Sequence, residues 1–234
     1  MKVMDASELY DPEFRKLIES KNPTIIIPVG SIEQHGAHLP ITTDSDIVTE
    51  IASRLAKKCG FIVFPTLSYG VSWEHMPLFN ASVRSADPLG ALINSLIENQ
   101  IKSVKNLNSH HGNVKTLKLM EHSAPFLHPK DFKIDFYSYW NFMKHEFDHA
   151  GFVETSLMLA ISDKVKMKKA KKGFTTKGVS EKEIQRINKL STQLGGFPKV
   201  AKNGVWGDPT GATKKDGGKF LAEIVRNLVK ECQS

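Results

Sequence analysis

The feature that most constrains the fold is the alternation of short apolar runs with longer amphipathic stretches. Residues 25–29 form the clearest apolar run, which is typical of a strand buried inside a sheet. A stretch with apolar residues at helical spacing follows over residues 45–58, and the same succession recurs towards the C-terminus. Strands separated by helices favour a mainly parallel sheet covered by helices on both faces. We therefore predict an α/β protein.

The same pattern places the remaining elements. It predicts strands over residues 25–29, 61–67 and 132–139, and helices over residues 45–58, 88–101, 151–162, 180–194 and 216–229. Residues 102–107 must form a strand if the alternation is kept, but they are polar for a buried parallel strand. We expect this strand to be short or to lie at an edge of the sheet. Residues 164–215 are expected to form long loops around the helix at 180–194.

Size and composition indicate one soluble domain over residues 1–234. Apolar residues make up 40% of the chain and charged residues 24%, as is ordinary for a globular protein. No apolar run approaches the roughly 18 residues that span a bilayer, and the first residues lack the apolar core of a signal peptide. Cys59 and Cys232 lie far apart in the sequence. We therefore expect a cytoplasmic protein without a membrane partner or a disulfide framework.

The net charge of +7 comes largely from a lysine-rich stretch at residues 164–172. This stretch contains neither an aromatic residue nor an arginine, so it lacks the stacking and reading groups of a nucleic-acid site. We expect a solvated face and no nucleic-acid partner, although such a charge can attract an anionic substrate.

A first cluster of polar residues follows the strand at 25–29. It comprises Glu33-Gln34-His35-Gly36, then His38-Leu39-Pro40, and then Asp44. Residues at i and i+2 of an extended segment point the same way, so Glu33 and His35 can face one site. Carboxylates and imidazoles at this density suit a divalent metal ion. The alternative is structural: a surface acid, a loop histidine, and Asp44 as the N-cap of the next helix.

Two further clusters follow predicted strands. In residues 108–113 His110 and His111 are adjacent, so only one of them readily enters a given site, and residues 148–156 include His149 and Glu154. Glu154 could instead be an acid that compensates a helix dipole. A parallel sheet would bring all three clusters to one edge, where α/β sheets bind ligands. The pooled donors, which suit two metal ions, are Glu33, His35, Asp44, His110 and Glu154.

On these motifs the chain resembles the creatininase family of metal-dependent amidohydrolases over residues 25–229. The resemblance is carried by residues 28–36 with 38–40 and 44, by 149–151 with 154–156, and by 204–209 with 212, 213 and 217. It implies a three-layer α/β/α sandwich with a mainly parallel sheet, assembled as a homo-oligomer, often a hexamer. It also implies two divalent ions per chain (zinc, manganese or iron) at the positions that match Glu33, His35, Asp44 and His110, with Glu154 as the fifth ligand.

The chain departs from the family pattern at three places. In creatininase a further ligand is a glutamate two residues after the histidine that matches His110, and here this position is Gly112. His111 replaces a glycine of the family pattern. The loop at residues 70–75 keeps the Gly, Ser and Glu-His positions, but a Phe-Pro-Gly-Thr pattern is replaced by residues 78–81. These departures bear on the substrate more than on the metal ions, and they place creatinine itself in question.

The resulting hypothesis is hydrolysis of a C–N bond in a small cyclic amide by a hydroxide that two metal ions generate. Asp44 would bridge the ions, Glu33 and His110 would complete one, and His35 and Glu154 the other. His149 would protonate the leaving nitrogen, or else orient a ligand. The predicted substrate-binding residues are Trp73, His75 and His111, although Trp73 could simply pack.

Three alternatives stay open at this stage. Family relatives deformylate a formamidopyrimidine nucleotide in flavin and deazaflavin biosynthesis, and others process a peptide precursor. A metal-binding scaffold without activity is the non-enzymatic alternative, which the intact set of donors disfavours.

Overall fold

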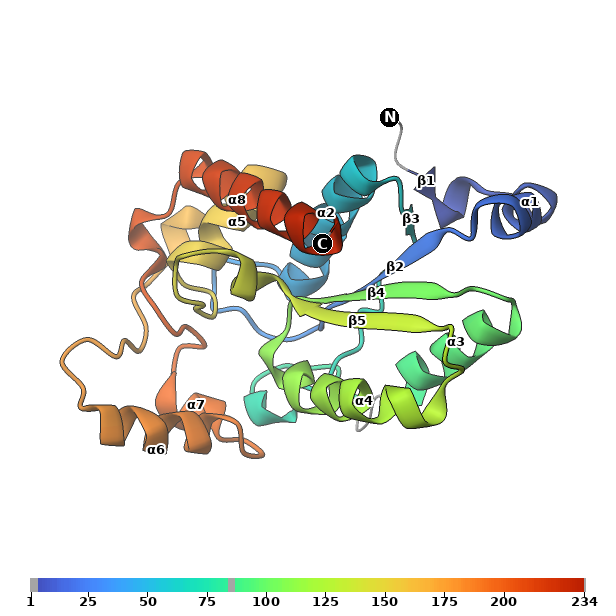
Figure 1. Cartoon of the computed structure of the whole chain (residues 1–234). Coiled ribbons are helices and arrows are strands. Elements are labelled where there is room, and N and C mark those ends of the chain that lie inside the picture. Colours follow the sequence, from blue (N-terminus) through green and yellow to red (C-terminus); the bar gives the residue numbers. More distant parts are fainter. Residues whose placement is uncertain (1–3, 84–86, 234) are drawn as a thin grey trace.

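A five-stranded parallel sheet lies at the centre of the computed structural model, which describes residues 4–83 and 87–233 (Figure 1). The strands are β1 (Met4–Asp5), β2 (Thr24–Val29), β3 (Ile62–Val63), β4 (Ser103–Asn108) and β5 (Lys133–Ser138). Their spatial order is β1-β3-β2-β4-β5, and every neighbouring pair is parallel. The predicted α/β class is confirmed.

Helices cover both faces of this sheet. They are α1 (Asp11–Lys21), α2 (Thr43–Cys59), α3 (Asp87–Glu98), α4 (Val114–Leu127), α5 (Phe152–Ile161), α6 (Glu181–Ser191), α7 (Phe197–Val200) and α8 (Lys214–Gln233). Figure 1 shows α2, α5 and α8 on one side of the sheet, and α3 and α4 on the other. This arrangement is the predicted three-layer sandwich.

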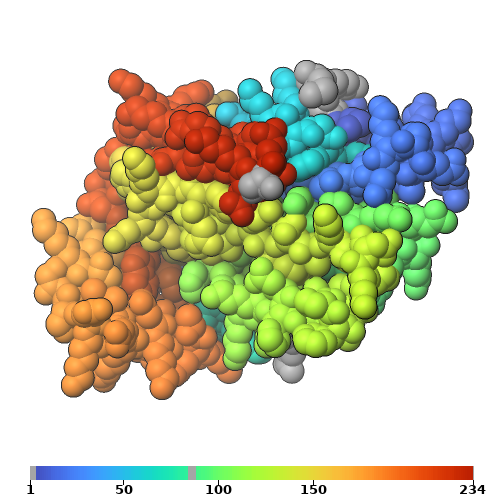
Figure 2. Space-filling model, in the orientation of Figure 1, coloured from blue at the N-terminus to red at the C-terminus, as the bar shows by residue number. Residues whose placement is uncertain are grey.

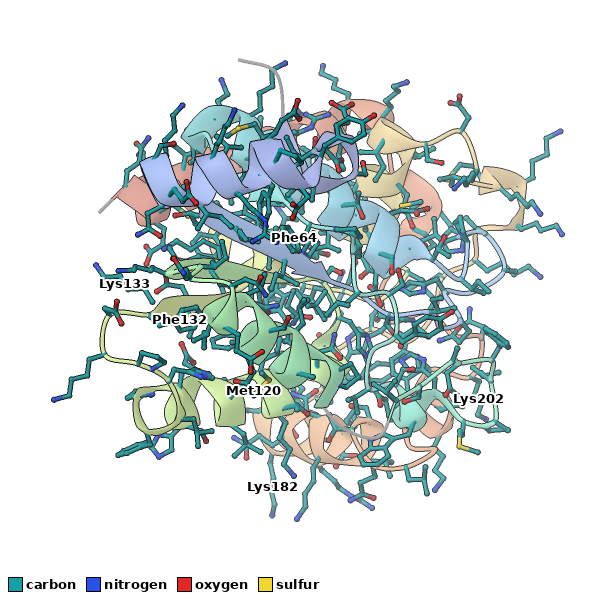
Figure 3. The ribbon with its side chains drawn as sticks, turned by 90° about the vertical axis from the view of Figure 1, so that its right-hand side faces the viewer. Phe64, Met120, Phe132, Lys133, Lys182 and Lys202 are labelled. Atoms are coloured by element: carbon teal, nitrogen blue, oxygen red, sulfur yellow. The ribbon has the colours of Figure 1, made fainter. Side chains whose placement is uncertain are left out.

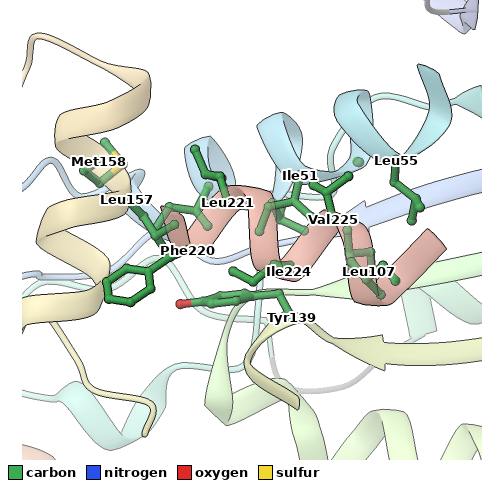
Figure 4. Close-up of a cluster of buried hydrophobic side chains, with 14 of the residues drawn as sticks. Ile51, Leu55, Leu107, Tyr139, Leu157, Met158, Phe220, Leu221, Ile224 and Val225 are labelled. Carbon is green, nitrogen blue, oxygen red and sulfur yellow. The ribbon is translucent and has the colours of Figure 1, made fainter. Parts of the chain in front are cut away.

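Strand β2 separates the two hydrophobic cores, because its side chains alternate between the faces of the sheet. Ile26 belongs to the core beneath α2, α5 and α8. In that core the ring of Tyr139 lies under Ile224 of α8, with Leu157 of α5 beside them (Figure 4). Each of these four side chains is buried.

The opposite face of β2 supports the second core. Ile25, Ile27 and Val29 pack there with side chains of α3 and α4. Phe64, Met120 and Phe132 lie among the partly buried residues around it (Figure 3). Lys182 and Lys202, by contrast, lie at the periphery of the same view.

The strand predicted at residues 102–107 is present, but the expectation that it is short or lies at an edge was wrong. β4 has six residues and lies between β2 and β5, so it is neither short nor an edge strand. Two of its polar side chains have partners: Asn106 Nδ2 donates to the Ile27 carbonyl at 3.3 Å, although Asn106 Oδ1 is unpaired, and Lys105 forms an ion pair with Asp135. These contacts compensate for the burial of polar groups.

Other elements also differ from the prediction. β3 has only two residues where residues 61–67 were expected to form a strand. Helices α1 and α4 were not predicted. Within the described ranges, no helix is long and apolar enough to cross a membrane.

The register of the sheet brings the polar clusters together. Val29 at the end of β2 pairs with Asn108 of β4, which in turn pairs with Ser138 of β5. The segments that follow these three residues therefore leave the sheet at the same edge. Figure 2 shows the segment that carries α6, in orange, at one end of the molecule against the green and yellow segments.

Candidate metal centre

The loop after β2 directs Glu33 and His35 into one buried site, as their i, i+2 spacing predicts. Ser31 Oγ donates to Glu33 Oε2 at 3.2 Å, which leaves Oε1 facing the site. His35 Nδ1 lies 3.1 Å from the Glu33 carbonyl. Because a carbonyl can only accept, Nδ1 carries the hydrogen and Nε2 is left to face the site. Both side chains are fully buried.

Two helix N-termini supply the other carboxylates. α2 has Thr42 as its N-cap, so the alternative in which Asp44 caps this helix is wrong. Asp44 lies within the first turn instead, and its Oδ1 is 3.5 Å from His35 Nε2. Glu154 is in the first turn of α5, where its Oε2 accepts from the Ala150 amide at 2.7 Å and lies 3.6 Å from His35 Nε2.

His110 completes the cluster from the end of β4. Its Nδ1 lies 3.2 Å from Asp44 Oδ2 and 3.3 Å from Glu33 Oε1, while Nε2 donates to the Val71 carbonyl at 2.8 Å. The ring of His111 is not one of the grouped donors, as expected for a residue adjacent to His110; it stacks on Trp140 and Phe147 and lines the cavity above the cluster.

The five predicted donors form two groups that share Asp44. One group is Glu33, Asp44 and His110, and the other is His35, Asp44 and Glu154; within each, the ligand atoms all lie within 4.8 Å of one another. Each predicted donor except His110 also has a buried atom without a hydrogen-bond partner: Glu33 Oε1, His35 Nε2, Asp44 Oδ2 and Glu154 Oε1. Unpaired buried polar atoms are costly unless a ligand satisfies them, so these residues fit a pair of cations.

Charge coupling within the cluster is strong when no metal is bound. Burial acts to raise the pKa of Glu33, but the imidazoles of His110 and His75 hold it well below its usual range. Burial acts to lower the pKa of His35, but Asp44 and Glu154 raise it to about 9. Burial opposes the charge on His110 too, yet Glu33 and Asp44 raise its pKa well above the usual value. His35 and His110 are therefore protonated in the metal-free protein, whereas burial raises the pKa of Glu154 well above its usual value.

Gln34 is a residue of the site that the sequence reasoning missed. Its Oε1 accepts from the Gly36 amide at 3.0 Å, so its Nε2 must face the two neighbouring imidazoles. Nε2 lies 2.9 Å from His75 Nδ1 and 3.2 Å from His149 Nε2. Gly204 leaves room for this amide, because a Cβ there would lie 1.8 Å from Gln34 Oε1, and its φ of +74° also favours glycine.

The predicted proton donor, His149, lies beside the cluster. Its Nδ1 is 3.7 Å from Glu33 Oε1, and its ring packs against that of His35 with centroids 4.3 Å apart. Burial, reinforced by the charges of His35 and His75, lowers the pKa of His149 well below its usual value. The ring is therefore neutral in the metal-free protein.

A cavity of about 190 Å³ opens onto the cluster. Three of the predicted site residues, His75, His111 and His149, line it together with Glu33, Asp44 and His110. Trp73 is not among the lining residues, and its side chain is 42% exposed. Glu74 and the aromatic walls were not predicted, although Trp206 belongs to a motif already noted; these walls are Phe147, Phe197 and Trp206.

Comparison with known sequences gives consistent matches along the chain. The family model for creatininase, described as creatinine amidohydrolase, matches residues 7–232. The mycofactocin precursor peptide peptidase of Mycobacterium ulcerans (strain Agy99) is 30% identical over 223 residues, covering 88% of this chain and 83% of that protein. The creatinine amidohydrolase of Pseudomonas putida is 27% identical over 183 residues, covering 66% and 70%.

Solved structures show the same fold. A crystal structure of creatinine amidohydrolase matches with a TM-score of 0.78 at 23% identity, covering 99% of this chain and 97% of that one. A putative creatinine amidohydrolase from Bacteroides fragilis NCTC 9343 matches with a TM-score of 0.75 at 27% identity, covering 98% and 95%. Among the other similar structures are a manganese form of creatininase and a Zn–Zn form of a mutant creatininase.

Proposed function

This chain belongs to the creatininase family, and from that premise we propose that it is a metal-dependent hydrolase that cleaves an amide C–N bond in a small cyclic substrate. The observation that carries the proposal is the pair of buried ligand groups that share Asp44 and open onto a cavity. A shared carboxylate between two groups is the arrangement of a two-metal hydrolase.

In this proposal Asp44 would be shared by two divalent ions. Glu33 and His110 would complete the ligands of one ion, and His35 and Glu154 those of the other. Such a pair, when bound, polarises a carbonyl group and makes a water nucleophilic near neutral pH. The candidates are zinc, manganese and iron, which accept mixed carboxylate and imidazole ligands.

His149 is the proposed proton donor to the leaving nitrogen. An amide nitrogen leaves poorly until it is protonated, so the reaction needs a group that hands it a proton. His149 lines the cavity with its Nδ1 3.7 Å from Glu33 Oε1, and on the far side of the ring Nε2 donates to the Gln34 backbone carbonyl at 3.0 Å. A neutral ring can take a proton as the water attacks and then pass it to the nitrogen.

The size of the cavity supports a small substrate. Its volume of about 190 Å³ is below the roughly 300–1,000 Å³ of sites for drug-sized ligands. Its aromatic walls suit a flat ring. We propose that His111 and His75, which line the cavity, contact the substrate. Trp73 lies outside this lining, so its proposed contact requires a substrate that extends beyond the cavity.

A peptide substrate is the second candidate. It is favoured by the Mycobacterium ulcerans peptidase, which matches 88% of this chain where the Pseudomonas putida amidohydrolase matches 66%. A peptide would place one terminal residue in the cavity. The nucleotide alternative has less support, because no lysine or arginine is found among the described residues that line the cavity.

The test is an activity screen of the metal-reconstituted protein. Creatinine, other cyclic ureides, lactams, short peptides and formamidopyrimidine nucleotides are each incubated with zinc- or manganese-loaded protein, and the products are identified by mass. We expect a gain of one water in a cyclic amide, and loss of that activity on chelation. A folded, metal-loaded protein that hydrolyses peptides alone would favour the second candidate, and one that hydrolyses none of these compounds would contradict the proposal.

A further inference from the structure

Glu74 is a buried carboxylate for which the proposed function has so far no role. It lies on the short 3₁₀ turn Trp73–His75, is 7% exposed, and lines the cavity. Among the described residues, no hydrogen bond joins its side chain to another residue. Its closest ionic contact is between Oε1 and His110 Nε2, at 3.6 Å. Burial of a charged carboxylate without a close partner is costly, and it raises the pKa of Glu74. Either a proton or a cation bound beside Glu74 compensates for this cost.

His110 is not that partner. Its Nε2 already donates to the Val71 carbonyl at 2.8 Å, and 3.6 Å is too long for a second hydrogen bond. The tautomer of His110 is therefore set by Val71, and Glu74 is not needed to hold it.

Glu33 connects Glu74 to the metal centre. Glu33, Glu74 and His75 form a further group whose ligand atoms all lie within 4.8 Å of one another. Glu33 also belongs to the group with Asp44 and His110. Its buried Oε1 lies 3.1 Å from His75 Nε2 and 3.3 Å from His110 Nδ1, so this oxygen lies where the two groups meet. Glu74 belongs to the group with Glu33 and His75, which adjoins the group of Asp44 and His110 through Glu33.

Gly112 provides the space for this arrangement. A Cβ at position 112 would lie 2.5 Å from Glu74 Oε1 and 2.4 Å from His110 Nε2. Contacts this short do not occur, so any other residue there would displace Glu74, His110 or the Val71 carbonyl, which would lie 2.1 Å away. The observed positions of Glu74, His110 and the Val71 carbonyl therefore require glycine at position 112.

We propose that Glu74 is an additional ligand of the ion held by Glu33, Asp44 and His110. This inference rests on the proposed function, because it assumes that the two-metal centre forms. It makes the two halves of the centre different, with three carboxylates around one ion and two around the other. Four carboxylates also balance the charge of two dications. Because oxygen ligands suit manganese, the half with Glu74 is expected to be the one that favours Mn²⁺.

The test is a titration of the metal-free protein with Mn²⁺ alone, followed by electron paramagnetic resonance and by metal analysis. The wild-type protein should bind two ions per chain and give the spectrum of a coupled pair. Glu74→Gln, which keeps the volume and removes the charge, should bind one ion as before and the other at least about tenfold more weakly. Glu74→Asp should lie between the two. The matched control is Glu98→Gln, at an exposed glutamate on α3, which should behave as wild type.

The outcomes separate this inference from the proposed function. Two Mn²⁺ ions bound by folded Glu74→Gln with wild-type affinity would exclude Glu74 as a ligand and leave the hydrolase proposal intact. A wild-type protein that binds no divalent ion would overturn both. If Glu74→Gln does not fold, Glu74→Asp provides the test, because its shorter side chain shifts the carboxylate. Unchanged Mn²⁺ affinity in Glu74→Asp would then count against the inference.

Discussion

The hydrophobic core beneath α8 and the polar cluster at the sheet edge are both closed to solvent, but they are satisfied in different ways. Ile224, Leu221 and Leu157 are buried against apolar neighbours, so their burial itself stabilises the fold. The cluster around Asp44 buries polar atoms that have no partner in the protein. The hydrophobic core therefore needs no ligand to be stable, whereas the cluster around Asp44 has the composition of a binding site.

The largest effect is expected when Asp44, the carboxylate that both ligand groups share, is removed. Asp44→Ala takes a ligand from both groups, so we expect more than about a 100-fold loss of metal affinity at each site, since even outer partners of metal ligands contribute 10- to 100-fold. Metal analysis after dialysis measures the loss. Asp46→Ala, two residues along α2, is the matched control. Full metal content in Asp44→Ala would exclude a bridging role.

A substitution in the hydrophobic core should lower the stability of the fold and leave metal binding unchanged. Ile224→Ala removes buried methyl groups beneath α8, and we expect it to lower the free energy of unfolding by about 2–5 kcal/mol. The metal content per folded chain should not change. Urea unfolding measures the first quantity and metal analysis the second. If the variant retained its stability but lost its metal ions, the two regions would not be separable.

Gln34 lies between these extremes, because it binds no cation but its side-chain amide holds the imidazole of His75. Gln34→Leu keeps a similar volume and removes the amide that donates to His75 Nδ1, while the backbone carbonyl that accepts from His149 Nε2 stays in place. We expect kcat to fall by about 10- to 100-fold, as for other residues that orient groups at a metal site, while the metal content stays near wild type. Steady-state kinetics on the substrate identified by the screen measure this effect. Unchanged kcat would exclude a positioning role.

The smallest effect concerns pH. The pKa of His35 is raised to about 9 in the metal-free protein, and a metal ion must displace that proton. Affinity for the ion that His35 and Glu154 are proposed to hold should therefore rise by about tenfold per pH unit between pH 7 and 9. The stabilisation that this imidazolium contributes to the metal-free fold is fully present below pH 6.5 and is lost towards pH 9. Calorimetric titrations measure the metal affinity, which should rise with pH, and thermal melts measure the stability of the metal-free protein, which should fall. If both quantities rose or both fell over this range, the prediction would be contradicted.

The sequence predicts the outline of the fold well, and its errors have identifiable causes. The apolar run of β2 and the amphipathic pattern of α8 depend on local periodicity, which the sequence displays directly. β4 was misplaced because its polarity is compensated by partners distant in sequence, Ile27 and Asp135. No local pattern contains that information.

The candidate site shows the same limit. The five predicted donors converge because parallel strands end at one edge, a consequence of topology that sequence order reveals. Glu74 and Gln34 were missed because their roles depend on close packing against Gly112 and Gly204. Trp73 was expected at the cavity because of its position in the chain, but the turn that buries Glu74 and His75 leaves its ring half exposed. Whether each donor binds a metal ion stays a prediction until metal is measured.

The packing of α8 over α2 and α5 has a consequence for when metal can bind during synthesis of the protein. Phe220, Leu221 and Ile224 pack in the same core as Ile51 of α2 and Leu157 of α5, and these two helices carry Asp44 and Glu154. A nascent chain that has not yet released residue 214 from the ribosome therefore lacks the element that fixes two of its carboxylates. We expect metal uptake to follow the synthesis and packing of α8.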